Sequence, residues 1–158
     1  MAIASLPFGT AAPDDSPAAV PPPGHRVSAT RGATAEPAAV PALRHFAGET
    51  ARQWRVPAEA VRRLELVVSE LVTNVVLHSR SADVSVSVEL DGAALTVEVQ
   101  DSGTWRNRWA APPSGEDRAP TGGHGLEVVR HHCLWWLAFP SPAGTRVVAS
   151  LSAGPGTE

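Results

Sequence analysis

Residues 66–78 read Leu-Val-Val-Ser-Glu-Leu-Val-Thr-Asn-Val-Val-Leu-His, and this stretch decides the fold. On a helix, Glu70, Asn74 and His78 are spaced four apart and stack along one face. The residues between them form an apolar surface wide enough to bury most of the helix, and they are Val67, Val68, Leu71, Val72, Val75 and Val76. Because unpaired buried polar groups are costly, a carboxylate and an amide on such a helix need a partner. We therefore predict that a metal ion or a polar ligand lies against this face.

Composition sets the outer limits of the function. The chain has 158 residues, which suits one ordinary domain plus a tail, and its formal charge of −3 suggests no nucleic-acid partner. No apolar run approaches the ~20 residues that span a membrane, and the N-terminus lacks the features of a secretory signal. A single cysteine excludes an internal disulfide framework and a zinc site built from cysteines. We expect a soluble cytoplasmic protein.

The basic residues are all arginine, because the sequence contains no lysine. A Walker P-loop needs a lysine on the nucleotide phosphates, and a eukaryotic-type protein kinase needs one on its third strand. Both kinds of nucleotide site are therefore excluded. Any phosphate bound here must be held by backbone amides, by arginine or by a metal ion.

The chain divides into three parts. Residues 1–24 are rich in alanine and proline and show no periodicity, which predicts a disordered tail. Residues 25–152 form the predicted domain, and residues 153–158 form a short C-terminal tail. A proline-rich loop of some twenty residues after Asp101 is long for so small a domain, and such loops are usually functional or mobile.

Hydrophobic periodicity predicts the element order βααββαββ. Asp91-Gly92 marks a hairpin turn between two strands with clean alternation. The expected strands are 25–30, 84–89, 95–100, 134–139 and 145–151, and the expected helices are 36–54, 57–78 and 126–132. The fold class is therefore an α/β two-layer sandwich, with a mixed sheet and helices on one face.

Three glycine-bearing segments follow the apolar helix, and each is a weak signal alone. Asp101-Ser102-Gly103 places a carboxylate at a strand end, where it could accept a hydrogen bond from an exocyclic amine such as that of adenine. It is also an ordinary strand-ending turn. Gly122-Gly123-His124-Gly125 opens a helix whose free amides can bind phosphate. Gly144-Thr145 by itself reads as a turn followed by a strand.

Together, these segments form an ordered set of motifs: Glu-x-x-x-Asn on a helix, Asp-x-Gly, Gly-x-Gly-Leu and Gly-Thr. This order resembles the GHKL (Bergerat-fold) ATP-binding family over about residues 26–151. The sequence from Glu70 to His78, together with Gly123-His124-Gly125-Leu126, is similar to the corresponding motifs of bacterial anti-sigma factor serine kinases and their ATP-binding regulatory relatives. The resemblance implies the Bergerat fold and two cofactors, ATP and Mg²⁺.

The resemblance also implies roles for single residues. In this family the helix asparagine, here Asn74, coordinates Mg²⁺ that bridges the nucleotide phosphates. Glu70 is the general base toward the attacking hydroxyl or water. Asp101 receives the adenine amino group, with Gly103 beside the ring and Thr145 in support.

The glycine-rich segment is implied to hold the phosphates. Gly123 and Gly125 would contact them through the backbone, at the hinge of a lid formed by the long loop, and His124 and Leu126 belong to the same binding motif. Arg44, on the first helix, falls near a position that contacts the protein partner in similar proteins. Relatives of this type are commonly dimers, which leaves a homodimer open.

Other side chains receive plainer interpretations. His131 and His132 are adjacent and cannot share a helix face, so a histidine metal site with His78 or His124 is disfavoured. Cys133 is interpreted as a core residue rather than a nucleophile. Trp135 and Trp136 alternate along a strand, so one of them should face outward, as in a binding surface.

Three functions remain open. The first is an ATP-dependent serine/threonine kinase that restrains a sigma factor and phosphorylates an anti-anti-sigma (STAS-type) partner. The second is a non-catalytic ATP-sensing interaction module on the same fold. The third, the catalytic domain of a sensor histidine kinase, is disfavoured because the short N-terminal tail holds no helical pair with a phosphoacceptor histidine.

Overall fold

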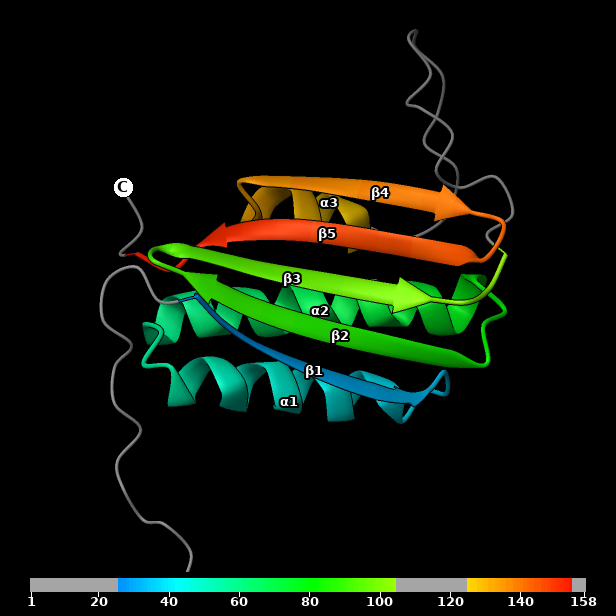
Figure 1. Cartoon of the computed structure of the whole chain (residues 1–158), viewed down its shortest axis with the longest axis horizontal. Helices are drawn as coiled ribbons and strands as arrows, with labels where there is room; N and C mark the ends of the chain where they lie inside the picture. The colour runs from blue at the N-terminus through cyan, green and yellow to red at the C-terminus, as the bar shows by residue number, and fades with distance from the viewer. Residues whose placement is uncertain (1–25, 105–124, 155–158) are drawn as a thin grey trace, which may run out of the picture.

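The computed structural model describes residues 26–104 and 125–154. The predicted element order is confirmed, and the elements are shown in Figure 1. The strands are β1 (Arg26–Thr34), β2 (Asp83–Asp91), β3 (Ala94–Asp101), β4 (Trp135–Ser141) and β5 (Gly144–Ser152). The helices are α1 (Ala39–Gln53), α2 (Ala58–His78) and α3 (Gly125–His132).

The five strands form one sheet in the order β1-β2-β3-β5-β4. All three helices lie on one side of it, which confirms the two-layer sandwich (Figure 1). The prediction of a mixed sheet was wrong, because every pair of neighbouring strands is antiparallel. Two helices, not one, connect β1 to β2, so the chain reverses three times and β2 returns antiparallel to β1.

A single helix connects β3 to β4, as in a parallel βαβ unit. Since β5 is antiparallel to both strands, β3 and β4 do run parallel to each other. They are not neighbours, however, because β5 is inserted between them. The crossover therefore places β4 at the edge of the sheet, and β5 fills the position between β3 and β4.

The hydrophobic core lies between the sheet and the helices. Alternate residues of β2 and β3 point toward the helices, and those of β2 are Val84, Val86, Val88 and Leu90. From α2, the core takes Leu64, Val67, Val68, Leu71, Val72 and Val75, all at most 3% exposed. One apolar face of the helix is thus buried. The half-buried remainder of its surface holds Glu70, Asn74 and His78.

Local signals explain where the elements begin and end. Pro57 precedes the first turn of α2 with φ of −54°, a value that the proline ring favours. Gly92 occupies the hairpin between β2 and β3 with a positive φ of 58°, which confirms the predicted turn. β1 runs four residues beyond the predicted strand, to Thr34, because it pairs with β2 along its whole length.

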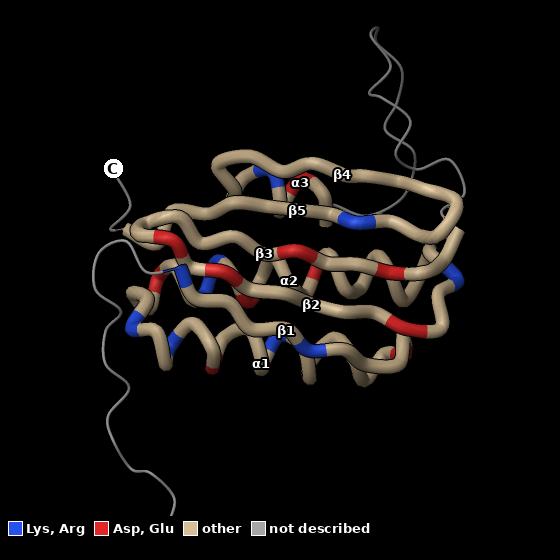
Figure 2. The backbone as a smooth tube through the Cα atoms, viewed as in Figure 1, with Lys and Arg blue, Asp and Glu red and all other residues tan. Residues whose placement is uncertain are grey.

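The other face of the sheet carries no helix in the described residues (Figure 1). Figure 2 marks acidic residues along β2 and β3 and an arginine on β5, and Glu89, Glu98 and Arg146 line a cavity on this face. Within the described ranges, no helix is long and apolar enough to cross a membrane. The predicted tails and the loop after Asp101 fall mostly outside residues 26–104 and 125–154, so their boundaries stay predictions.

Candidate functional site

The end of β3 and the start of β5 place two polar side chains side by side. Asp101 and Thr145 are directly paired in the register of these strands. Both follow the alternation that turns Val97 and Val99 toward the helices, so both point into that layer. Asp101 is 4% exposed and Thr145 is 3% exposed. A carboxylate and a hydroxyl thus lie together at a buried strand end.

Backbone geometry fixes the position of the Asp101 carboxylate. Its Oδ1 accepts a hydrogen bond from the backbone N–H of Gly103 at 2.9 Å. Across the strand pair, Gly144 has a positive φ of 139°, and a Cβ there would overlap the carbonyl oxygen of Asp101. Only glycine accommodates both the conformation and the contact. Asp101 is therefore held from its own turn and from the neighbouring strand.

Gly103 also joins the end of β3 to the end of α2. A Cβ on Gly103 would overlap the carbonyl oxygen of Ser79, the residue that follows the helix, and would crowd the backbone nitrogen of Ser81. Since these obstacles are backbone atoms, no side-chain rotation could relieve them. The glycine is therefore needed for close approach and brings Asp101 against the last turn of α2.

A serine network, which the sequence reading missed, strengthens this junction. The Ser81 hydroxyl donates to the carbonyl oxygen of Asp83 at 2.6 Å and accepts from the backbone N–H of Ser102 at 2.9 Å. The Ser102 hydroxyl in turn donates to Oδ1 of Asp83 at 2.9 Å. Serine just after a helix is a known turn former, so the Ser79-Arg80-Ser81 stretch offered a signal. Arg80 between them has a positive φ of 54°.

Glu70 lies farther back along α2, against the start of α3. A Cβ on Gly125, the first residue of α3, would overlap Oε2 of Glu70. The first turn of a helix carries unpaired N–H groups and a partial positive charge, which favour a carboxylate or a phosphate. Glu70 therefore lies where the sequence predicts phosphate binding.

The predicted residues form a row along α2. Glu70 lies beside Gly125 and Asn74 comes one turn later, and the helix ends at Ser79, whose backbone carbonyl lies against Gly103 of the Asp101 turn. At 1.5 Å per residue, the row from Glu70 to Ser79 is about 14 Å long. This arrangement suits an elongated ligand with a polar ring system at one end and anionic groups at the other.

Asn74 offers a single amide oxygen at the middle of this row. Mg²⁺ keeps several waters and is commonly held by one or two protein oxygens together with substrate phosphates. The described residues contain no group of three or more His, Cys, Asp or Glu that could hold a metal. The amide oxygen of Asn74, with the Glu70 carboxylate one turn away, fits a Mg²⁺ ion that binds together with a phosphate ligand.

The remaining predicted residues have separate positions. Leu126 is half-buried in the first turn of α3, and Arg44 is exposed on α1. Gly123 and His124 lie outside the described residues, so their roles stay predictions. Cavities of about 430 Å³ and 280 Å³ both include Asp101 in their lining. A larger cavity, of about 500 Å³, lies on the open face of the sheet and away from this site.

Replacing Gly103 by alanine should loosen the junction between α2 and β3. Because the new Cβ meets backbone atoms, we expect a loss of about 1–3 kcal/mol in the free energy of unfolding, measured by urea denaturation. Gly32→Ala is the matched control, since the nearest atom to its Cβ would be the Val84 carbonyl oxygen at 3.8 Å. Equal stability of the two variants would contradict the proposed junction.

Cys133 should be a slow nucleophile. Burial raises the pKa of its thiol to about 11, because it disfavours the charged thiolate. At pH 8 only about one thiol in a thousand is ionised, so iodoacetamide should react on the order of 100 times more slowly than with free cysteine. The rate should rise about tenfold per pH unit up to pH 10. The alkylation rate is measured by mass spectrometry, and a rate that stops rising near pH 9 would contradict this pKa.

Comparison with known proteins agrees with this geometry. The family model described as "Histidine kinase-like ATPase domain" matches residues 33–148. Among solved structures, the chain is similar to the crystal structure of the RsbU and RsbW domains of Rv1364c from Mycobacterium tuberculosis. That match has 17% sequence identity and a TM-score of 0.63, and it covers 80% of this chain and 32% of that one.

No curated protein matches in the sequence search. The solved structure, at its low identity, supports the fold alone, and this chain spans about a third of its length. The family match, by contrast, covers most of the chain and includes α2, Asp101 and Thr145. The predicted GHKL resemblance is thereby confirmed, and the chain belongs to the histidine kinase-like ATPase family.

Proposed function

We propose that this protein is an ATP-binding regulator of the anti-sigma factor type. In this proposal it transfers the γ-phosphoryl group of ATP to a serine or threonine of an anti-anti-sigma (STAS-type) partner and restrains a sigma factor. The observation that carries it is the arrangement along α2. Glu70 lies beside Gly125, Asn74 comes one turn later, and Gly103 of the Asp101 turn packs against Ser79 at the helix end. Because the chain belongs to an ATPase family, we take ATP as the nucleotide.

Adenine would bind at the Asp101 end of the row. The Asp101 carboxylate accepts a hydrogen bond from the N–H of Gly103. Because a carboxylate has about four acceptor positions, it could also accept from the exocyclic amine of the base. Thr145 lies opposite Asp101 in the register and contributes a hydroxyl. The family resemblance places Gly103, which packs against the end of α2, beside the ring. This end would therefore select a base that presents an amine donor.

The phosphates would lie at the α3 end, near Asn74. The free N–H groups at the start of α3 supply hydrogen bonds without any lysine, and the sequence assigns Gly123 and Gly125 to the same task. Mg²⁺, when bound with the nucleotide, would neutralise phosphate charge, and Asn74 is the residue that would hold it. The absence of lysine from the chain is compatible with this way of holding phosphates.

The transfer step needs a base beside the phosphates. The partner hydroxyl oxygen would form a bond to the γ-phosphorus, while the bond to the β–γ bridging oxygen breaks and ADP leaves with that electron pair. Glu70 would accept the hydroxyl proton as general base. One helical turn separates Glu70 from Asn74, so a base there lies next to the phosphate-bound metal.

A non-catalytic ATP-sensing module is the alternative. It is favoured by one observation, namely that the Glu70 carboxylate lies against Gly125 at the start of α3. A nucleotide phosphate at this helix end would displace Glu70, and the displacement could signal occupancy without any transfer. Both functions require ATP to bind, and they differ in whether Glu70 then acts on a hydroxyl.

The partners in this proposal follow from the family resemblance. Exposed Arg44 on α1 is assigned to the protein partner, and a homodimer is compatible with the proposal. The solved neighbour joins its RsbW domain to an RsbU domain in one chain. Because ATP is the substrate, we place the protein in the bacterial cytoplasm.

Phosphotransfer with a Glu70→Gln variant tests the proposal. The protein is incubated with Mg-[γ-³²P]ATP and purified STAS-type proteins and sigma factors of its source organism. We expect transfer to a STAS-type serine or threonine that falls about 10²–10⁴-fold in the variant, while ATP affinity changes less than about threefold.

Glu59→Gln on the same helix is the control, because Glu59 is exposed and pairs only with the neighbouring Arg62 in the described structure. It should keep full transfer. ATP binding without transfer to any candidate would support the sensing module instead. No ATP binding by the wild-type protein would contradict both functions.

A further inference from the structure

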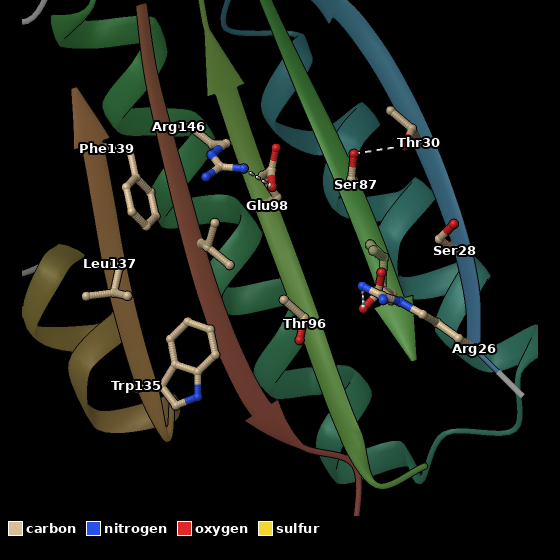
Figure 3. A pocket seen from close by; sticks show the side chains of 13 residues that line it. Arg26, Ser28, Thr30, Ser87, Thr96, Glu98, Trp135, Leu137, Phe139 and Arg146 are labelled. Atoms are coloured by element: carbon tan, nitrogen blue, oxygen red, sulfur yellow. Dashed lines mark hydrogen bonds and ion pairs between the residues drawn. The ribbon is translucent and has the colours of Figure 1, made fainter. Parts of the chain in front are cut away.

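The open face of the sheet contains a groove of about 500 Å³, which the nucleotide proposal does not use (Figure 3). One side of the groove is lined by β4, at Trp135, Leu137 and Phe139. The other side is lined by β1, where Arg26 is the first described residue of the domain. The groove therefore begins where the N-terminal segment joins the sheet.

The β4 side of the groove is an exposed apolar stripe. Trp135 is 48% exposed, Leu137 is 54% and Phe139 is 44%. They alternate with Trp136 and Ala138, which pack toward the core, so the prediction that one of the two tryptophans faces outward is confirmed. Adjacent large apolar side chains on a surface usually mark a place where another segment or molecule binds.

We propose that the chain's own residues 17–23, Pro-Ala-Ala-Val-Pro-Pro-Pro, bind in this groove as a polyproline II segment. These residues lie outside the described part of the structure, and the inference rests on their sequence and on where the chain enters the sheet. Grooves lined by aromatic side chains bind such segments because their extended form is preset by proline. A segment that orders only on binding also agrees with the tail predicted for residues 1–24.

The reach of the segment matches the width of the groove. Arg26 and Trp135 lie at the same end of the sheet, as Figure 3 shows, and four strand spacings separate β1 from β4. At about 4.8 Å per spacing, this distance is about 19 Å. A polyproline II chain advances about 3.1 Å per residue, so Pro21 to Pro23 would lie about 9–16 Å from Arg26. Val20 would then reach Trp135.

The chemistry of the groove also matches the segment. Its two arginines are already paired, Arg26 with Glu89 at 2.7 Å and Arg146 with Glu98 at 3.5 Å, so its charge is balanced. Residues 16–24 carry no charged side chain. Prolines lack an N–H and leave carbonyl oxygens unpaired, and the hydroxyl of Thr96 and the Trp135 indole N–H lie in the groove as donors.

The covalent connection makes weak contacts sufficient. A short linker gives a tethered segment an effective concentration in the millimolar range. A contact with a dissociation constant near 1 mM would therefore be about half occupied without any further affinity. When bound, residues 17–23 would also cover the apolar stripe, and a second copy or a partner would have to displace them.

Paramagnetic relaxation in the full-length chain tests this directly. A nitroxide is attached to Ala18→Cys in a Cys133→Ser background, and the indole N–H signals are observed in ¹⁵N-labelled protein. The Trp135→Phe variant lacks one indole N–H signal, which identifies the signal of Trp135. We expect the Trp135 signal to lose at least half its intensity, while the Trp54 signal, on the helix side of the sheet, loses much less. Equal losses would overturn the proposal.

Two further samples identify the occupant. Spin-labelled ¹⁴N protein is mixed with unlabelled ¹⁵N protein, and selective broadening of Trp135 in this mixture would show that a second copy binds there, which overturns the intramolecular proposal. Replacing Pro21, Pro22 and Pro23 by glycine should reduce the selective broadening at least twofold, and Pro13→Gly should not. An unchanged effect in the triple variant would overturn the role of the proline run.

Discussion

The close approach of Gly103 to the carbonyl oxygen of Ser79 is the contact on which the candidate site depends. It joins the end of α2 to the end of β3 with backbone on both sides, so neither segment can move without the other. Asp101 is fixed by the same turn and is backed by Gly144 of β5. Two glycines thus hold a buried carboxylate in place at the edge of the core, and the backbone N–H of Gly103 offsets part of the cost of burying it.

The Glu70 side of the candidate site, in the middle of α2, is held less firmly. Glu70 lies against Gly125 through the tip of a flexible side chain, which could swing away without disturbing the backbone. In the proposed function, the base would bind at the rigid Asp101 end and the phosphates at the adjustable Glu70 end, so that nucleotide state could alter the contacts of the protein. The same helix supplies both ends, because its apolar residues are buried and its polar row is left at the margin of the core.

Much of this arrangement was predictable from the sequence. The strict alternation of Val84, Val86 and Val88 with serines identifies the buried face of β2, and the four-residue spacing of Glu70, Asn74 and His78 identifies the polar row. Strand order was less accessible, because a single helix between β3 and β4 indicates a parallel crossover but cannot reveal that β5 is inserted between them. The hydrogen bonds of Ser81 were also not predicted, because bonds between residues some twenty positions apart leave no periodic pattern in the sequence.

Binding of Mg-ATP, measured by isothermal titration calorimetry, tests most directly whether the Asp101 end of the row holds adenine. In Asp101→Asn, Oδ1 can still accept from Gly103, but the carboxylate charge and one acceptor are lost. We expect the wild-type protein to bind and the variant to bind about 10–100 times more weakly. Asp91→Asn, at the exposed hairpin, should bind like the wild type. Equal affinities of the wild-type protein and Asp101→Asn would contradict the assignment of this end to the base.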